Sequence, residues 1–491
     1  MKYNQLLLFA MLVLLKVGFV CSQEVRDNTR IELKLPLVDW QTLKFRHKNS
    51  ENIFKMLEDH RKSISNMSAG SCTETGIKLF REFYHIDPTE YSINDIKRNA
   101  TSILQAAFRL MVQYKEQYNN LGYKNISSDC VDATRKGFLA LRSFGDYIGY
   151  VSQVKLPAQG NELPAGTLFV NTNLNDQRLK SGDVIISRGN AYSSAVISRV
   201  TDTVTQFSHL AIVYIDPKDL KKYVIEAHIE QGTIVTTWEK YIQDGKIRAL
   251  VMRQNDAKLA HNAAQKIYNY IIDYQKRNHK NVPYDFGMQL DEPSELFCSE
   301  VVQLAYKLGS QDRSEGTFRL PQFLSQSTSK NVIKEALGIN EVKAFFSPND
   351  VEVDTRFSIV AEYKNYELIN QAWGKDAMIT FLFDLWNKNQ ITLRPSIASK
   401  LVTKLAMKFR NTSWGRKNLV EKVPENGPYE GVLMMTILNV FASADLDEWL
   451  ENANKLQRKE GLPPMNYTQT LNFLSQNQDE FLNEFSRFFA L

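Results

Sequence analysis

A cysteine, a preceding histidine and an acid between them could together carry out nucleophilic catalysis in this sequence. Cys298 lies in the stretch LFCSEVVQLAYKLG, where apolar residues recur at the spacing of one helical face. We expect Ser294 to cap this helix and Cys298 to lie at or near its first turn. Unpaired N–H groups and the helix dipole lower the pKa of a thiol there. The alternative is that Cys298 is a small buried hydrophobic residue on the core face.

A thiol nucleophile needs a base, and two predicted strands supply candidates. His209 opens SHLAIVYI, and in KYVIEAHI the side chains of Glu226 and His228 share one face. If the two strands are neighbours, Glu226 or His228 can reach the imidazole of His209. Such a set provides a nucleophile, a base and a group that orients the base. The structural alternatives are an ordinary strand-end histidine for His209 and a solvated strand face for Glu226.

Four blocks of the sequence resemble the circularly permuted papain-like amidases, the YiiX/YaeF-like branch of the NlpC-type cysteine hydrolases. The blocks are LKSGDVIISR, FSHLAIVY, VIEAHIEQGTIV and YDFGMQLDEPSELFCSEVVQLAY, and SPNDVEVDTRFSIVAEY is similar to the family's C-terminal end. In ordinary papain-like enzymes the cysteine precedes the histidine, whereas here His209 comes first, as in the permuted branch. The resemblance implies Cys298 as nucleophile, His209 as base and Glu226 as the orienting residue. His228 is the competing third member, because some permuted relatives use a second histidine.

The expected chemistry is attack of the Cys298 thiolate on a carbonyl, with an acyl-enzyme as the intermediate. His209 then delivers its proton to the leaving group. The backbone N–H of Cys298 is the expected oxyanion donor. Tyr284 and Asp285 lie just upstream in the sequence and are candidates to line the cleft. Ser299 projects from a different side of the helix, so we do not expect it to be the nucleophile.

A metal site is the alternative use of the same residue types. His209, His228 and Cys298 offer zinc ligands, but their spacing matches no compact zinc motif. The sequence therefore predicts no metal and no other cofactor.

The elements that must position these residues change in character along the chain. Residues 49–153 show helical periodicity, the loop VKLPAQGNELPAG follows, and short segments rich in Val, Ile and Thr come next. We predict an α+β, circularly permuted papain-like domain over residues 154–366, with a small antiparallel sheet packed on the helix of Cys298. Helical regions are predicted on either side, at residues 23–153 and 367–491. Their helices are expected to pack on one another or on the middle domain.

The first 22 residues have the pattern of a secretory signal peptide. Lys2 gives a short positive region, and the apolar run that follows is too short to span a bilayer. A membrane anchor and a lipid-modified Cys21 are the alternatives. The predicted location is therefore secreted or periplasmic.

Cysteine counting supports the choice of nucleophile. Cys72, Cys130 and Cys298 remain after removal of a signal peptide, so at least one thiol is unpaired. Cys72 and Cys130 both flank predicted helices of the N-terminal region, and we expect them to form a disulfide. Cys298 then stays reduced.

Composition bounds the class of protein more than its substrate. The chain has 491 residues, 43% hydrophobic and 23% charged, which is typical of a globular protein. The net charge is +5, and Lys and Arg form no cluster along the sequence. No nucleic-acid partner is therefore predicted. The expected substrate is a peptide or a lipid of the cell envelope. An inert envelope-binding module, a lipid acyltransferase and peripheral contact with a membrane stay open, as does the oligomeric state.

Overall fold

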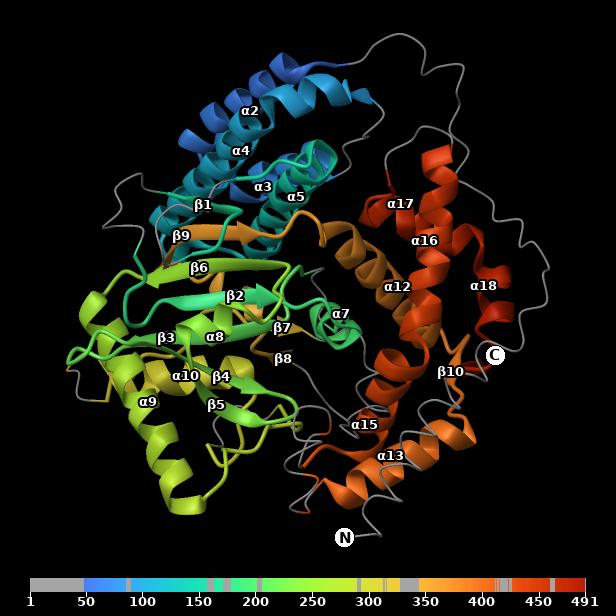
Figure 1. The fold of residues 1–491 in the computed structure, drawn as a ribbon. Coiled ribbons are helices and arrows are strands. Elements are labelled where there is room, and N and C mark those ends of the chain that lie inside the picture. Colours follow the sequence, from blue (N-terminus) through green and yellow to red (C-terminus); the bar gives the residue numbers. More distant parts are fainter. Residues whose placement is uncertain are drawn as a thin grey trace.

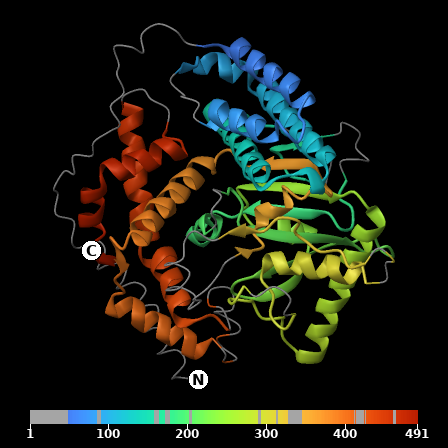
Figure 2. The same cartoon turned by 180° about the vertical axis from the view of Figure 1, so that it is seen from behind.

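The computed structural model describes residues 48–84, 90–156, 163–170, 178–200, 205–288, 293–311, 314, 316–326, 344–410, 412, 415, 423, 426–459 and 464–490. The N-terminal helices lie at one edge of a central sheet, and the C-terminal helices lie beside that sheet (Figures 1 and 2). The predicted signal peptide, with Cys21, lies outside the described residues. Within the described part, no helix combines the length and the apolar character needed to cross a membrane.

The N-terminal helices carry the cysteine pair. They are α2 (Ser50–Ser65), α3 (Cys72–Leu79), α4 (Ile93–Leu121) and α5 (Ser128–Ser152), with a π-helical turn at Phe80–Tyr84. The side chain of Ser127 caps α5 by accepting the N–H of Cys130. Cys72, which begins α3, and Cys130, in the first turn of α5, form a disulfide with their Cα atoms 5.4 Å apart. Cys298 is the free cysteine among the described residues.

A seven-stranded antiparallel sheet forms the centre of the described structure, in the order β1-β9-β6-β2-β3-β4-β5. Its strands are β1 (Thr167–Phe169), β2 (Val184–Arg188), β3 (His209–Ile215), β4 (Lys222–His228), β5 (Gly232–Thr237), β6 (Arg248–Gln254) and β9 (Phe357–Lys364). The predicted strand segments correspond to β2 through β6 and to β9. The edge strand β1 was not predicted, because three residues are too few to show alternation. Together with the helices, the sheet makes this an α+β fold.

A glycine fixes the entry into β2. Gly182 has φ +90°, and a Cβ atom there would lie 2.4 Å from the carbonyl oxygen of Ala260. Only glycine fits this conformation and this close approach. The next residue, Asp183, accepts a hydrogen bond from Nη2 of Arg253 at 2.7 Å. The Gly-Asp pair therefore holds the start of β2 between a helix and β6.

Helices cover both faces of the sheet. On one face α9 (Ala257–Asn278) and α10 (Cys298–Gly309) pack on each other and on β3. On the other face the short helix α8 (Trp238–Ile242) joins a smaller apolar cluster. The helix α7 (Tyr192–Arg199) follows β2 and packs against the C-terminal helices. Between α10 and β9 lie a small ladder of β7 (Ser325–Gln326) with β8 (Ala344–Phe345) and a 3-10 turn at Pro348–Val351.

The C-terminal helices form a second core together with α7. The helices of this core are α12 (Ile369–Asn387), α15 (Tyr429–Thr436), α16 (Ser443–Lys459), α17 (Tyr467–Gln476) and α18 (Gln478–Glu484). The remaining helix, α13 (Ile397–Phe409), packs on α15 in a separate, smaller apolar cluster. A π-helical turn at Ile437–Phe441 continues α15, and β10 (Thr392–Leu393) pairs with β11 (Phe489–Ala490). The flanking helices therefore pack on one another and on the middle of the chain.

Buried ion pairs join the flanking helices to the sheet. Arg248 of β6 lies 2.8 Å from Asp146 of α5. On the other side, Asp376 of α12 accepts from Arg188 at 2.6 Å and from Arg199 at 2.9 Å. Removing one partner of a buried pair leaves an uncompensated charge and costs about 3–5 kcal/mol. These pairs therefore fix α5, α7 and α12 relative to the sheet.

Candidate active site

Cys298 is the first residue of α10, and Phe297 is the N-cap. The prediction that Ser294 caps this helix was wrong. Leu296 donates its N–H to the carbonyl of Pro283 at 2.9 Å, which pairs the preceding segment with a neighbouring chain segment. The Glu300 side chain then accepts the N–H of Phe297 at 3.1 Å and so marks the start of the helix. Cys298 consequently lies directly at the end where N–H groups are unpaired.

His209 is the first residue of β3 and lies between an acid and the thiol. Its Nε2 atom is 2.7 Å from Oε2 of Glu226. The thiol of Cys298 hydrogen bonds the same imidazole, so Nδ1 is the ring nitrogen left to face the sulfur. The backbone N–H of Leu210 also donates to the sulfur. Two consecutive residues of β3 thus contact the thiol.

Glu226 lies on β4, opposite Ala211 of β3, and only 3% of its surface is exposed. Its second oxygen, Oε1, lies 3.1 Å from Nε2 of His228. The rings of His209 and His228 meet edge to face, with centroids 5.6 Å apart. Glu226, rather than His228, is therefore the hydrogen-bond partner of His209, and His228 lies against the far oxygen of the same carboxylate.

The charges of these groups favour a thiolate paired with an imidazolium. Burial raises the pKa of the Cys298 thiol, but the hydrogen bond and charge of His209 outweigh burial and lower that pKa below its ordinary value. Burial lowers the pKa of His209, yet its bonds to Cys298 and Glu226 bring it up to about 9. Burial opposes ionisation of Glu226, while both histidines hold its pKa well below the usual range. These shifts favour a thiolate at Cys298, an imidazolium at His209 and a carboxylate at Glu226.

Two further acidic side chains form a pair beside the nucleophile. Glu300 and Asp285 are both buried. Burial, together with the charge and hydrogen bond of Asp285, raises the pKa of Glu300 to about 9. Glu300 is therefore protonated at neutral pH, which keeps one negative charge away from the thiolate at Cys298.

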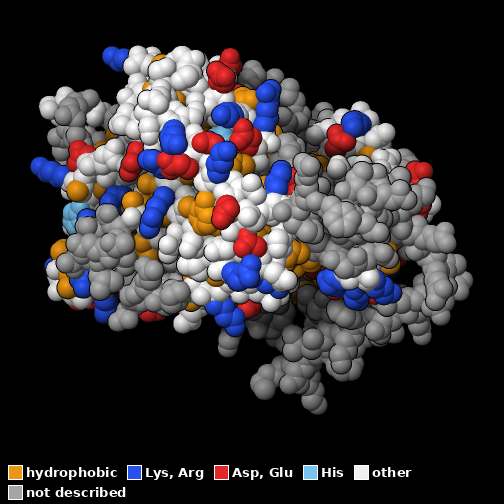
Figure 3. All heavy atoms as spheres, turned by 90° about the horizontal axis from the view of Figure 1, so that it is seen from above, with side chains coloured by type: hydrophobic (Ala, Val, Ile, Leu, Met, Phe, Trp, Pro, Cys, Tyr) orange, Lys and Arg blue, Asp and Glu red, His pale blue; other side chains and the backbone are white. Residues whose placement is uncertain are grey.

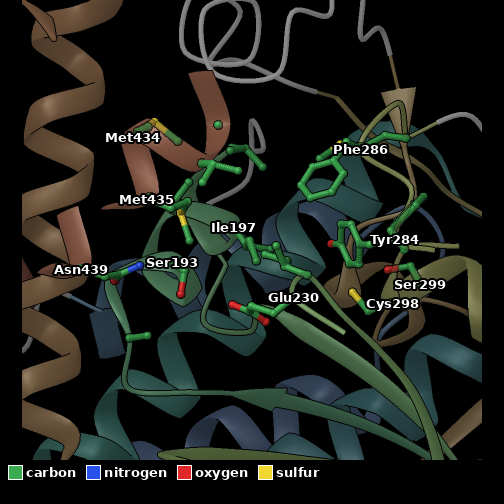
Figure 4. Close-up of a pocket in the computed structure, with 18 of the residues that line it drawn as sticks. Ser193, Ile197, Glu230, Tyr284, Phe286, Cys298, Ser299, Met434, Met435 and Asn439 are labelled. Carbon is green, nitrogen blue, oxygen red and sulfur yellow. The ribbon is translucent and has the colours of Figure 1, made fainter. Parts of the chain in front are cut away.

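Cys298 lies where two cavities of different character meet. The larger has a volume of about 360 Å³ and is mainly apolar, and side chains from α7, from the segment before α10 and from α15 point into it (Figure 4). Its apolar lining includes Val196, Ile197, Val200, Ile229, Phe286, Met288, Phe345, Phe346, Val432, Met434, Met435 and Val440. The smaller cavity, of about 160 Å³, holds His209, Glu226 and His228. The thiol therefore has apolar space on one side and polar space on the other.

The residues that could hold a metal are part of the same cluster. His209, Glu226 and His228 offer ligand atoms that all lie within 4.8 Å of one another. In the described arrangement each oxygen of Glu226 faces the Nε2 atom of one histidine. The zinc set considered from the sequence, His209 with His228 and Cys298, differs from this cluster, because Cys298 is not part of it.

The middle of the chain is similar to one known family. Residues 178–352 match the permuted papain-like amidase enzymes, the YaeF/YiiX C92 family. The predicted resemblance is confirmed, and the match spans His209, Glu226 and Cys298. No curated protein and no solved structure matches the chain. The C92 match ends before α12, so the part of the cavity wall that α15 supplies lies outside it.

Several residues of the site were not evident from the sequence. Glu230, just after β4, lines both cavities, and burial raises its pKa. Met434 and Met435 come from α15, far away in the sequence, and no local pattern marks them as cavity residues.

Tyr284 was a candidate for the cleft, and it lines both cavities beside Cys298 (Figure 4). Asp285, the other candidate, pairs with Glu300 instead.

Proposed function

We propose that this protein is a cysteine hydrolase that cleaves an amide or ester bond through an acyl-enzyme at Cys298. The observation that carries the proposal is the chain of contacts from Cys298 to His209 to Glu226, placed at the junction of the two cavities. The C92 family match supports amidase or hydrolase chemistry. A degenerate domain has no reason to keep all three side chains in contact, which argues against an inert binding module.

The first half of the reaction forms a thioester. The Cys298 thiolate attacks the substrate carbonyl, and the backbone N–H of Cys298 at the helix start stabilises the oxyanion. Tyr284 is a second candidate donor, because burial and the charge of Cys298 raise its pKa well above the ordinary value and keep its hydroxyl protonated. The tetrahedral intermediate collapses as the carbon–nitrogen or carbon–oxygen bond breaks. The leaving amine or alkoxide takes the proton of the His209 imidazolium.

The second half releases the acyl group. Neutral His209 accepts a proton from water, and the resulting nucleophile attacks the thioester carbonyl. The carbon–sulfur bond breaks, the free acid leaves, and the thiolate–imidazolium pair forms again. Glu226 keeps Nε2 of His209 hydrogen bonded throughout and stabilises the positive charge of the ring. Transfer of the acyl group to another acceptor than water would make the same site an acyltransferase.

The apolar cavity favours an acyl chain over a polar stem peptide as the group held on Cys298. Its volume of about 360 Å³ is in the range of small-molecule sites, and most of its lining consists of aliphatic, aromatic and methionine side chains. The polar cavity, with Asp244 and Lys246 at its rim, suits the hydrophilic leaving group. We therefore propose a lipid amide or ester of the cell envelope as the substrate, with an envelope peptide as the second candidate.

The proposed setting is outside the cytoplasm. The signal-peptide pattern at residues 1–22 and the Cys72–Cys130 disulfide both fit an oxidising compartment. We propose residues 154–366 as the catalytic region. The C-terminal helical region completes its apolar cavity through Gly431–Val440.

A paired substrate series tests this function. The wild-type chain is given dodecanoyl and acetyl-peptide substrates with the same p-nitroanilide leaving group, in parallel with Cys298→Ala and His209→Ala. The proposal expects turnover of the dodecanoyl compound, preferred over the peptide, and no turnover by either variant. A preference for the peptide would move the function to the second candidate. Full activity of Cys298→Ala would remove the nucleophile assignment.

A further inference from the structure

The outer face of α13 combines exposed apolar side chains with lysines. Ile397 is 87% exposed and Leu401 is 43% exposed, and the two lie one helical turn apart. Lys400, Lys404 and Lys408 form a parallel row at the same spacing. An apolar strip bordered by lysines is typical of a helix that lies in the interface of a membrane.

The stretch of sequence that contains α13 carries charge of one sign, although the neighbouring helix α15 has an exposed Glu430 in its first turn. Between Asp384 and Glu421 the sequence contains no acidic residue. The same interval contains Lys388, Arg394, Lys400, Lys404, Lys408, Arg410, Arg416 and Lys417. By contrast, the face of the molecule seen from above carries basic and acidic side chains intermingled (Figure 3). No basic cluster is evident along the sequence, because the lysines are spaced four apart and come together only on the helix.

The inner face of α13 packs beside the apolar cavity. Ala406 of α13 and Val432 of α15 belong to one small apolar cluster. Val432 also lines the cavity that reaches Cys298, and so does Val440, whose side chain is 50% exposed. Figures 1 and 2 show α13 and α15 as neighbours on the side of the molecule away from the N-terminal helices. The exposed apolar strip thus lies on the helix that supports one wall of the cavity.

We propose that α13 docks the protein on an anionic phospholipid surface, with Ile397 and Leu401 inserted among the acyl chains and the lysines at the headgroups. Lysine side chains suit this place, because their aliphatic stems lie along apolar surface while the ammonium groups stay in water. The positive charge of the lysine row favours an anionic membrane over a second copy of the chain, because two α13 faces would bring like-charged rows together. Docking brings the α15 wall of the cavity toward lipid. That last step rests on the proposed function, whereas binding to the surface does not.

Vesicle flotation tests the docking. The full chain is mixed with vesicles of phosphatidylcholine alone or of phosphatidylcholine with phosphatidylglycerol, at low and high salt. The expected result is binding to the anionic vesicles, weakened by salt because charge drives the encounter. Ile397→Asp with Leu401→Asp, and separately the triple change of Lys400, Lys404 and Lys408 to Glu, should each weaken binding by about tenfold or more.

Matched changes elsewhere on the surface serve as controls. Leu220 is 70% exposed on the turn between β3 and β4, and Lys455 is exposed on α16. Leu220→Asp and Lys455→Glu should bind vesicles like the wild type, and so should Cys298→Ala. Equal binding by the α13 variants and the wild type would overturn the docking, as would a wild-type dimer that Ile397→Asp dissociates. If the wild type binds vesicles but does not turn over soluble acyl substrates, that result counts against the proposed function and not against the docking.

Discussion

Oε2 of Glu226 lies 2.7 Å from Nε2 of His209, and the carboxylate is almost completely buried. A buried carboxylate needs a partner, and a histidine that must hold a proton needs a negative charge nearby. Each residue meets the requirement of the other, because the register of β3 and β4 places them on one face. The orientation and the charge of the base therefore follow from the pairing of two adjacent strands.

Glu226→Gln tests this relationship. An amide keeps a hydrogen bond but loses the charge that stabilises the imidazolium, so kcat/KM should fall by about 10²-fold with a measurable remnant. His228→Ala is the matched comparison, and it should cost less than about tenfold because His228 acts on the sulfur only through Glu226. Steady-state kinetics on a soluble acyl ester measures both. A larger loss from His228→Ala than from Glu226→Gln would reverse the roles of the two residues.

The value of kcat/KM should depend on pH in a bell shape, and the rate of Cys298 alkylation should follow its rising limb. Because the pKa of Cys298 is lowered, the thiolate is present below the ordinary thiol range, and the rate rises as the thiol ionises. Because the pKa of His209 is raised to about 9, the imidazolium is lost only as pH passes that value, and turnover then falls. Iodoacetamide labelling and kcat/KM across pH give the two limbs. In Glu226→Gln the upper limb should move to lower pH, and an unmoved limb would contradict its assignment to His209.

Met434 should set the length of acyl chain that the cavity accepts. Its side chain points into the apolar cavity from α15 (Figure 4). Met434→Trp adds bulk to that wall, so kcat/KM for a dodecanoyl ester should fall by about tenfold or more while a butyryl ester is hydrolysed as before. Lys455→Trp, which adds the same ring on the exposed face of α16, should leave the ratio unchanged. Equal loss on both esters by Met434→Trp would indicate a folding defect instead of a specificity change.

The disulfide should stabilise the N-terminal helices without taking part in the chemistry. Cys72 and Cys130 are both buried and are separated by 58 positions in the sequence. The double change of both cysteines to Ala should lower the free energy of unfolding by about 2–4 kcal/mol, measured by urea denaturation. Wild-type protein treated with a reductant should unfold like the double variant, and both should still react at Cys298. A urea midpoint that reductant does not change would argue that the bond is absent in solution.

The sequence predicted those parts of the site that local pattern determines. The alternation of apolar residues around His209 and Glu226 marked two strands, and the order of His209 before Cys298 agreed with the family resemblance. The start of α10 was predicted wrongly, because Ser294 is a good cap by type. The contact that decides the boundary, Leu296 to Pro283, joins two segments through tertiary structure.

The apolar cavity was beyond prediction for a similar reason. The helical spacing in the C-terminal region was visible, but periodicity cannot tell whether Met434 faces a core or a cavity. That distinction depends on how α15 lies against α7. The C-terminal helix α12 is held against β2 and α7 in the same way, by the pairing of Asp376 with Arg188 and Arg199. No sequence signal connects these three residues.

Intact-mass detection of an acyl group on Cys298 is the most direct test of the proposed acyl-enzyme. The wild-type chain and Cys298→Ala are each incubated with envelope lipid extract, quenched in acid and weighed, and the adduct is mapped by peptide mass. We predict a mass gain equal to a fatty acyl group, located on the peptide that contains Cys298 and absent from Cys298→Ala. Product formation by the wild type with no adduct at any time, or the same adduct on Cys298→Ala, would contradict it.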